Sequence, residues 1–395
     1  MSPFSHPFSR RHALELIGLG AAAAALPNLA HAQGEAPVFP KGAVIRTLFR
    51  DYAPEELAGG ATLFHEHMQL GTDFNQKFSA ASAAVRALNG PPAGAARAGG
   101  APGGGTPGGG TPGGGAPKGG GAPKGGGAKG GPPPTPGPDI MRDSNLMAAE
   151  VAKVKANGIA CIVDAGHPDM GRDIEFIRQV SMKSGVPIVA GGGFYTQPFY
   201  PQEISTMTED QIVKALIKQA DDGPMGVFGE IGSWDEITAD ERKVFRAVAK
   251  AHLATNLSVF THTGIPGKSA LEQLDLLVDG GVKPERIVIG HLGNLVDPNV
   301  YIHKTICRRG AFVAFDRQGG PGDANAVPMV MALIEAGFAD QIMFSADASS
   351  GYSKTMTVFV PKVKAAGASD AVIHKIMVDN PRRFLAFVPK RPRKK

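Results

Sequence analysis

Short hydrophobic segments alternate with longer amphipathic segments over most of the chain. The short segments, such as IACIVDAG at 159–166, are continuous apolar runs typical of buried strands. The longer segments have apolar residues at helical spacing and often end at glycine. The pattern predicts eight strands whose C-terminal ends lie near residues 65, 164, 190, 230, 262, 291, 316 and 347. It predicts helices between them over 143–158, 171–185, 208–221, 238–256, 269–280, 298–309 and 325–337.

Eight strand-loop-helix units in about 300 residues predict a (β/α)8 TIM barrel, an α/β fold whose active site lies at the C-terminal ends of the strands. The alternative is a doubly wound open sheet. That fold usually carries a glycine-rich dinucleotide-binding turn after its first strand, and the sequence has none there. The barrel is therefore the preferred fold class.

A glycine- and proline-rich stretch interrupts the pattern after the first strand. Residues 90–138 form a short-period repeat with almost no side chains to bury, so we expect a disordered insertion. The hydrolase barrel would then comprise residues 33–89 and 139–390, followed by a basic tail at 391–395. Since the insert follows the first strand, it should emerge at the active-site face.

The N-terminal 32 residues resemble an export signal. Arg10 and Arg11 precede an Ala/Gly/Leu run, and Ala30-His31-Ala32 matches a cleavage pattern. The signal is of the twin-arginine type, although Ala13 and the absence of a lysine after the run leave a general secretory signal as the alternative. The protein is thus expected in a bacterial periplasm, with the twin-arginine export machinery as a partner. No segment approaches the roughly 20 apolar residues of a spanning helix, which argues against a stable membrane anchor.

The charge balance is nearly neutral. The chain has 41 basic and 36 acidic side chains, and residues 1–32 hold two arginines and one glutamate, so 39 and 35 remain after signal removal. No basic stripe interleaved with aromatic residues is present. Nucleic acid is therefore not an expected partner.

Residues of metal-ligand type stand at five of the eight predicted strand ends. The first strand ends in His65-Glu66-His67, and because side chains alternate along a strand, the two histidines point the same way. In the predicted barrel, six residues of this type converge on one rim: His65, His67, Glu230, His262, His291 and Asp347. This convergence predicts a metal centre.

Six protein ligands are too many for one tetrahedral zinc ion but suit two ions that share a bridging carboxylate and a bridging water. Glu230 is the natural bridge, because it lies near the middle of the set. Two divalent ions acidify the bridging water and so produce hydroxide at neutral pH. Asp347 could hold a metal ion and also accept the proton as the hydroxide attacks.

Several motifs resemble the phosphotriesterase-related branch of the amidohydrolase superfamily, notably TLFHEH, GEIGSWDEIT, VFTHTG, IVIGHLGN, VAFDRQG and FSADAS. The similarity covers roughly residues 42–80 and 139–388. It implies a binuclear site in which His65, His67 and Asp347 hold one metal ion and His262 and His291 hold the other. Zinc is the expected metal, with manganese, cobalt and iron as alternatives. Many relatives use a carboxylated lysine as the bridge, whereas this chain has Glu230.

The resemblance implies hydrolysis of a small ester-like molecule. We expect the metal-bridging hydroxide to cleave a lactone or a carboxylic ester. The alternatives are a phosphotriesterase acting on organophosphates and a non-catalytic metal- or ligand-binding periplasmic protein. Family members are often homodimers, although no interface can be read from this chain. Four residues near the strand ends are candidate substrate contacts: Tyr195, Arg317, Trp234 and His167.

Overall fold

The computed structural model describes residues 36–89, 139–264, 267, 269–295, 297 and 299–391, with the side chains of 86–89 excepted. Residues from Pro37 onward belong to one compact unit. The predicted export signal at 1–32 and the predicted disordered insert at 90–138 lie outside the described residues. Within the described residues, no helix is long and apolar enough to cross a membrane.

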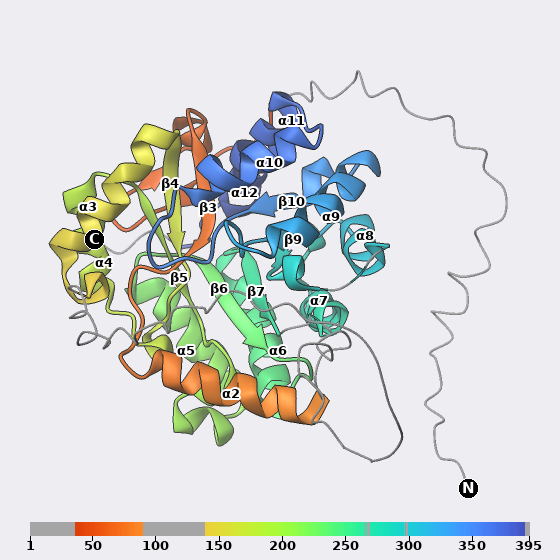
Figure 1. Cartoon of the computed structure of the whole chain (residues 1–395). Helices are drawn as coiled ribbons and strands as arrows, with labels where there is room; N and C mark the ends of the chain where they lie inside the picture. Colours follow the sequence, from red (N-terminus) through yellow and green to blue (C-terminus); the bar gives the residue numbers. More distant parts are fainter. Residues whose placement is uncertain are drawn as a thin grey trace, which may run out of the picture. The chain divides into compact units, whose positions relative to one another are not determined.

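Eight parallel strands form a single sheet in sequence order, surrounded by helices (Figure 1). The strands are β3 Ala61–Glu66, β4 Ile159–Asp164, β5 Ile188–Gly192, β6 Met225–Ser233, β7 Val259–Thr263, β8 Ile287–Ile289, β9 Phe312–Phe315 and β10 Ile342–Phe344. Two backbone hydrogen bonds join the last strand to the first beyond the regular ladder. The Asp347 N–H donates to the His65 carbonyl at 3.1 Å, and the His67 N–H donates to the Ala348 carbonyl at 2.9 Å. The predicted TIM barrel is confirmed.

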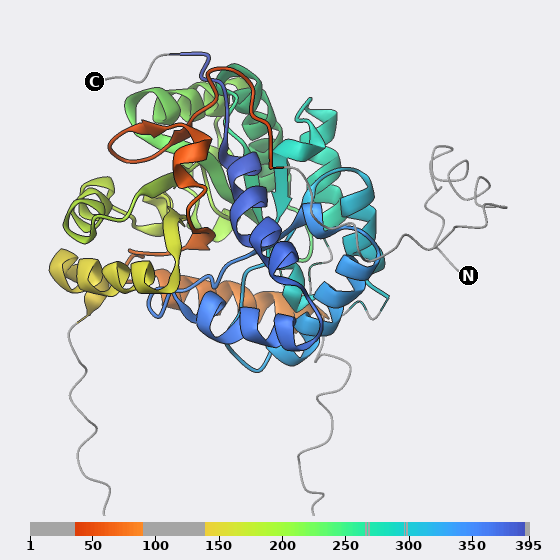
Figure 2. The ribbon, with the colours of Figure 1, turned by 90° about the horizontal axis from the view of Figure 1, so that it is seen from above.

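Helices follow the strands as the periodicity predicts. They are α3 Ser144–Ala152, α4 Ile174–Ser184, α5 Glu209–Asp222, α6 Ala239–Thr255, α7 Ala270–Asp279, α8 Tyr301–Arg308 and α9 Asp323–Glu335. The C-terminal helices α10 Val360–Ala365, α11 Asp370–His374 and α12 Asn380–Leu385 complete the surrounding layer (Figure 2). Capping boxes at Thr208 and Thr238 begin α5 and α6, because each threonine hydroxyl accepts a hydrogen bond from a backbone N–H three residues later.

One further helix, α2 Phe74–Asn89, follows the first barrel strand and is not among the predicted helices. Its alanine- and serine-rich sequence gives a weak apolar pattern. In Figure 1 it is the orange helix along one side of the ring of strands. Its residues Phe74 and Phe78 pack against Phe199 and Trp234, so the helix borders the loops that follow β5 and β6.

The core has two layers, as the alternation of side chains along a strand requires. Phe64, Phe260 and Phe312 belong to a buried cluster that fills the inside of the barrel. A larger cluster lies between the strands and the helices, with members such as Ile162 and Phe344. The barrel is therefore a packed core and not a channel.

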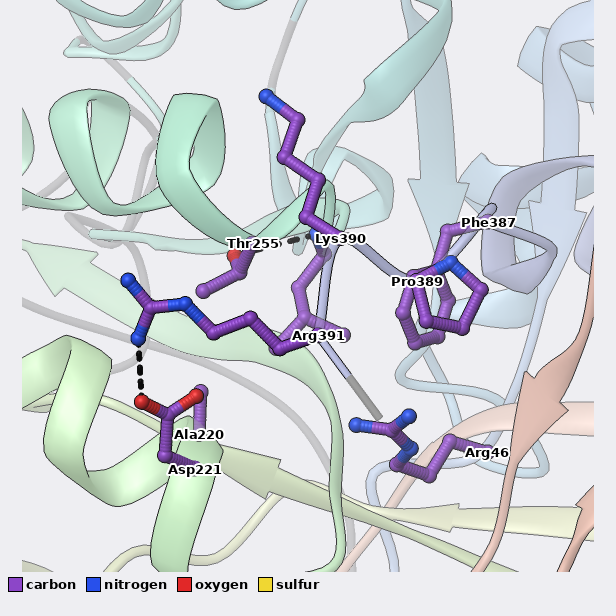
Figure 3. A pocket seen from close by; sticks show the side chains of 9 residues that line it. Arg46, Ala220, Asp221, Thr255, Phe387, Pro389, Lys390 and Arg391 are labelled. Carbon is purple, nitrogen blue, oxygen red and sulfur yellow. Dashed lines mark hydrogen bonds and ion pairs between the residues drawn. The ribbon is translucent and has the colours of Figure 1, made fainter. Parts of the chain in front are cut away.

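The N-terminal end of the barrel is closed by the antiparallel pair β1 Ile45–Arg46 and β2 Asp51–Tyr52 and by the C-terminal segment. Figure 3 shows Arg46, Phe387 and Pro389 around a small cavity at this end, with Arg391 ion-paired to Asp221. The cavity measures about 20 Å³, which is room for about one water molecule. This particular cavity is therefore too small for an organic substrate.

Candidate metal centre

The structure brings all six predicted ligands together at the C-terminal ends of the strands. They come from or directly follow β3, β6, β7, β8 and β10. Five of them are almost completely buried, and only Asp347 keeps appreciable exposure, at 15% of its side chain. The cluster thus meets solvent on the side of Asp347.

Glu230 stands between the two pairs of histidines. Its Oε1 lies 3.3 Å from His67 Nε2, and its Oε2 lies 2.9 Å from His262 Nδ1. Oε2 also lies 3.4 Å from both His65 Nε2 and His291 Nε2. One carboxylate therefore reaches all four imidazoles.

Two groups of potential ligand atoms share this carboxylate. His65, His67 and Glu230 form one triad, and Glu230, His262 and His291 form the other, with the ligand atoms of each triad within 4.8 Å of one another. His65 Nε2 is buried and has no hydrogen-bond partner among the described residues, although the Nδ1 atom of the same ring is hydrogen-bonded to Asp316. Imidazole nitrogens and carboxylate oxygens suit zinc, manganese, iron and cobalt. The residues present fit a pair of divalent ions.

Asp316, directly after β9, is a part of the centre that the sequence analysis missed. Its Oδ2 lies 2.9 Å from His65 Nδ1, and its Oδ1 lies 3.0 Å from His291 Nδ1. Oδ1 also accepts the backbone N–H of His291 at 2.9 Å. By accepting from both Nδ1 atoms, Asp316 would leave the Nε2 atoms of the two rings free to bind metal ions. The signal was a buried aspartate at a predicted strand end.

Replacing Asp316 with asparagine should weaken metal binding about 10- to 100-fold, because the ring orientation and tautomer of His65 and His291 are no longer fixed by a carboxylate. Competition with a chelator of known affinity measures this directly. Unchanged affinity for both ions would show that Asp316 does not position the ligands.

The loop that carries Asp347 is held by Glu66, which points away from the two histidines that flank it. Glu66 accepts hydrogen bonds from the Ser345 hydroxyl at 2.7 Å and from the backbone N–H groups of Ala346 and Ala348. Burial raises the pKa of Glu66 to about 7 despite these bonds. Asp347 itself has a φ of 50°, in the left-handed region, which a non-glycine residue holds only when its surroundings fix it. Its position is therefore imposed by the fold.

The charges of the cluster are strongly coupled. Burial disfavours a proton on His67, but its hydrogen bonds to Asp347 and Glu230 prevail and raise its pKa to about 10. Burial likewise opposes charge on His65, and the attraction of Glu230 and Asp347 raises its pKa well above its usual range. Burial and the neighbouring His291 lower the pKa of His262 to about 4. Protons therefore compete with metal ions at His65 and His67, and not at His262.

Metal binding should release about one or two protons per chain at pH 7, because a histidine must lose its proton to bind a metal ion. The affinity should rise with pH up to about 10, the raised pKa of His67. In the metal-free protein, that same raised pKa stabilises the fold fully below pH 6.5 and ceases to do so as the pH rises through about 10. Calorimetry in two buffers with different ionisation enthalpies counts the protons. A count of zero would contradict this picture.

The four candidate substrate contacts occupy different places. The Tyr195 hydroxyl lies 3.0 Å from His262 Nδ1, and Arg317 Nε donates to Asp347 Oδ2 at 2.9 Å. The Trp234 ring lies 5.9 Å from the His262 ring. His167 is buried, with its Nδ1 3.5 Å from Asp169, and Asp169 also accepts the backbone N–H of Tyr195. Tyr195, Arg317 and Trp234 therefore border the cluster. His167 is linked to the backbone of Tyr195 through Asp169.

Comparison with known proteins agrees with this geometry. A model of the phosphotriesterase family matches residues 53–385. The chain belongs to the phosphotriesterase family. The resemblance seen in the motifs is confirmed, and the protein is a metal-dependent hydrolase of that family.

Curated relatives of this family member have different activities. This chain is 31% identical over 266 residues to an aryldialkylphosphatase from Saccharolobus solfataricus. The matched region covers 60% of this chain and 84% of the relative. This chain is also 28% identical over 278 residues to an N-acetyltaurine hydrolase from Dictyostelium discoideum, and the match covers 63% of this chain and 75% of that relative. The phosphotriesterase homology protein of Escherichia coli, solved with phosphate in its active site, matches 83% of this chain and 99% of its own at a TM-score of 0.63. That match is 23% identical and supports the fold.

Proposed function

We propose that the protein hydrolyses a carboxylic ester or a lactone with the help of two divalent metal ions, with zinc as the expected metal. The observation that carries this proposal is Glu230, whose carboxylate belongs to both triads of potential ligands. A carboxylate in that position is suited to bridge two ions.

The two ions would occupy the two triads, with Asp347 as an additional ligand beside His67 at 3.0 Å. When bound, such ions acidify a water molecule and polarise the substrate's carbonyl group. The donor set contains no thiolate, because the two cysteines, Cys161 and Cys307, are buried elsewhere in the fold. Imidazole and carboxylate are the ligand types found at hydrolytic zinc centres.

Three side chains can then act on the substrate and its protons. Asp347 is the partly exposed carboxylate of the cluster and can accept the proton of the attacking water. Arg317 holds Asp347 in place through its Nε, and its positive charge adds to the effects of His65 and His67 that lower the pKa of that carboxyl against its burial. The Tyr195 hydroxyl beside His262 can donate a hydrogen bond to a substrate oxygen.

The names of the curated relatives indicate which bonds to compare. The N-acetyltaurine hydrolases are named for an amide substrate, and the aryldialkylphosphatase is named for an organophosphate. We favour a carbonyl substrate because no feature of the chain demands a phosphotriester. A phosphotriester remains the second candidate, favoured by the 31% identity to the aryldialkylphosphatase.

A rate comparison with the zinc-loaded protein tests this proposal. The substrates are 4-nitrophenyl acetate, δ-valerolactone, diethyl 4-nitrophenyl phosphate and N-acetyltaurine. We expect the highest kcat/KM for the ester or the lactone. A higher value for the phosphate or for the amide would reassign the reaction, and no turnover of any of the four would favour a binding protein.

We also propose that residues 1–32 direct export to a bacterial periplasm by the twin-arginine route, on the basis of Arg10, Arg11 and the Ala30-His31-Ala32 pattern. Fractionation of a producing bacterium tests this. Export should stop when both arginines are replaced by lysines, and export that continues would indicate the general secretory route.

A further inference from the structure

A cavity of about 740 Å³ lies beside the metal centre, between helix α2 and the loops that follow β5 and β6. Its volume is within the range of pockets that hold small organic molecules, roughly 300–1,000 Å³. Its walls include Ala81, Ala84 and Val85 of α2, Gln197 and Pro198 after β5, and Trp234 after β6. Most of its surface is contributed by apolar atoms.

The cavity exists because one side of α2 changes from large to small side chains. Near the start of the helix, Phe74 packs on Phe199 at 4.9 Å between ring centroids, and Phe78 packs on Trp234 at 5.2 Å. Further along the helix, the residues that face the same space are Ala81, Ala84 and Val85. Because these side chains are short, they leave room beyond Phe78 between the described parts of the chain.

The opposite wall is fixed by a buried carboxylate. Glu241, in the first turn of α6, accepts the backbone N–H of Gln197 at 3.2 Å and that of Thr238 at 2.9 Å. These two bonds join the loop after β5 to the start of α6. The cavity therefore lies between α2 and a wall that is fixed by hydrogen bonds, so we regard it as a preformed pocket.

Trp234 forms the boundary between this cavity and the metal centre. It lines the cavity, and its ring also lies 5.9 Å from the ring of His262. Trp234 is only 7% exposed, and its buried indole N–H has no hydrogen-bond acceptor among the described residues. A buried donor of this kind calls for an acceptor on whatever fills the space.

We propose that this cavity binds the aliphatic chain of a medium-length acyl substrate, with the indole N–H of Trp234 donating to a carbonyl or ether oxygen of that substrate. This inference rests on the proposed ester or lactone hydrolysis, because the cavity is one side chain away from the metal ligands. The apolar wall binds the methylene groups, and the small residues of α2 set the chain length that fits.

Trp234 is the only tryptophan of the chain, so its fluorescence reports on the cavity without any need for turnover. The probe is octanamide, with acetamide as the short control, titrated into the zinc-loaded protein. Ala84→Phe fills the cavity, and Ala83→Phe is its matched control, since Ala83 is an exposed neighbour on α2 that does not line the cavity. We expect saturable binding of octanamide to wild type and to Ala83→Phe, at least about tenfold weaker in Ala84→Phe. No saturable binding to wild type, or equal affinity in Ala84→Phe, would overturn the proposal.

Kinetics then connects the cavity to catalysis. Ala84→Phe should lower the ratio of kcat/KM for 4-nitrophenyl octanoate to kcat/KM for 4-nitrophenyl acetate about tenfold, whereas Ala83→Phe should leave this ratio at its wild-type value. An equal loss on both esters, or on neither, would overturn the assignment of the cavity to the substrate chain. A wild-type enzyme that hydrolyses neither these esters nor δ-valerolactone would reject the proposed function, and the fluorescence titration would still decide whether the cavity binds the chain.

Discussion

Asp347→Asn should lower kcat for the ester substrate by about 1,000-fold or more, within the range that a positioned general base contributes. The reason is geometric and electrostatic. Burial opposes the charge of Asp347, but His65, His67 and Arg317 overcome that effect and hold its pKa well below its usual range. Asp347 is therefore an ionised carboxylate and the most exposed of the six described ligands, and asparagine supplies the same shape without a proton acceptor.

The matched control is Asp323→Asn. Asp323 is equally short and is buried, but it accepts the backbone N–H of Gly319 and pairs with Lys362 at the start of α9. That variant should lose stability and keep wild-type kcat. A steady-state rate for Asp347→Asn within about tenfold of wild type would show that another group accepts the proton.

Glu230→Gln should remove the carboxylate that the two triads share and lower the affinity for the second metal ion about 100-fold or more. This loss is larger than the roughly 10- to 100-fold that is usual when a residue hydrogen-bonded to a metal ligand is replaced. An amide offers one acceptor oxygen and one NH2 donor, so it cannot bridge two cations as a carboxylate does. The measurement is a metal titration with the activity followed in parallel.

Glu241→Gln is the control for that change, because Glu241 is also a fully buried glutamate but accepts only backbone N–H groups near the cavity wall. It should bind two ions as wild type does. Binding of two ions with unchanged affinity by Glu230→Gln would show that the bridge is another group.

The fold could be predicted from the sequence because a buried parallel barrel leaves a strong pattern. Each predicted strand end lies within three residues of the end seen in the structure. Continuous apolar runs and the amphipathic segments between them are sufficient for this, since every strand is buried on both sides. Helix α2 was missed because alanine and serine occupy most of its middle part, and its two phenylalanines lie about one turn apart at its start.

The six ligands could be predicted as a group because their residue types and their places at the strand ends are both visible in the sequence. Their mutual distances could not, since these depend on the closure of the barrel between β10 and β3. Asp316 shows the limit most clearly. It stands next to Arg317 at a predicted strand end, yet only the structure reveals that it joins the Nδ1 atoms of His65 and His291.

The central claim is a pair of metal ions on one glutamate, and elemental analysis of the mature protein tests it most directly. The protein would be purified without chelator, with several divalent metals supplied, and the metal content per chain compared for wild type and Glu230→Gln. We expect about two equivalents for wild type and one or fewer for the variant. One equivalent or none in wild type, at full occupancy, would contradict the shared site.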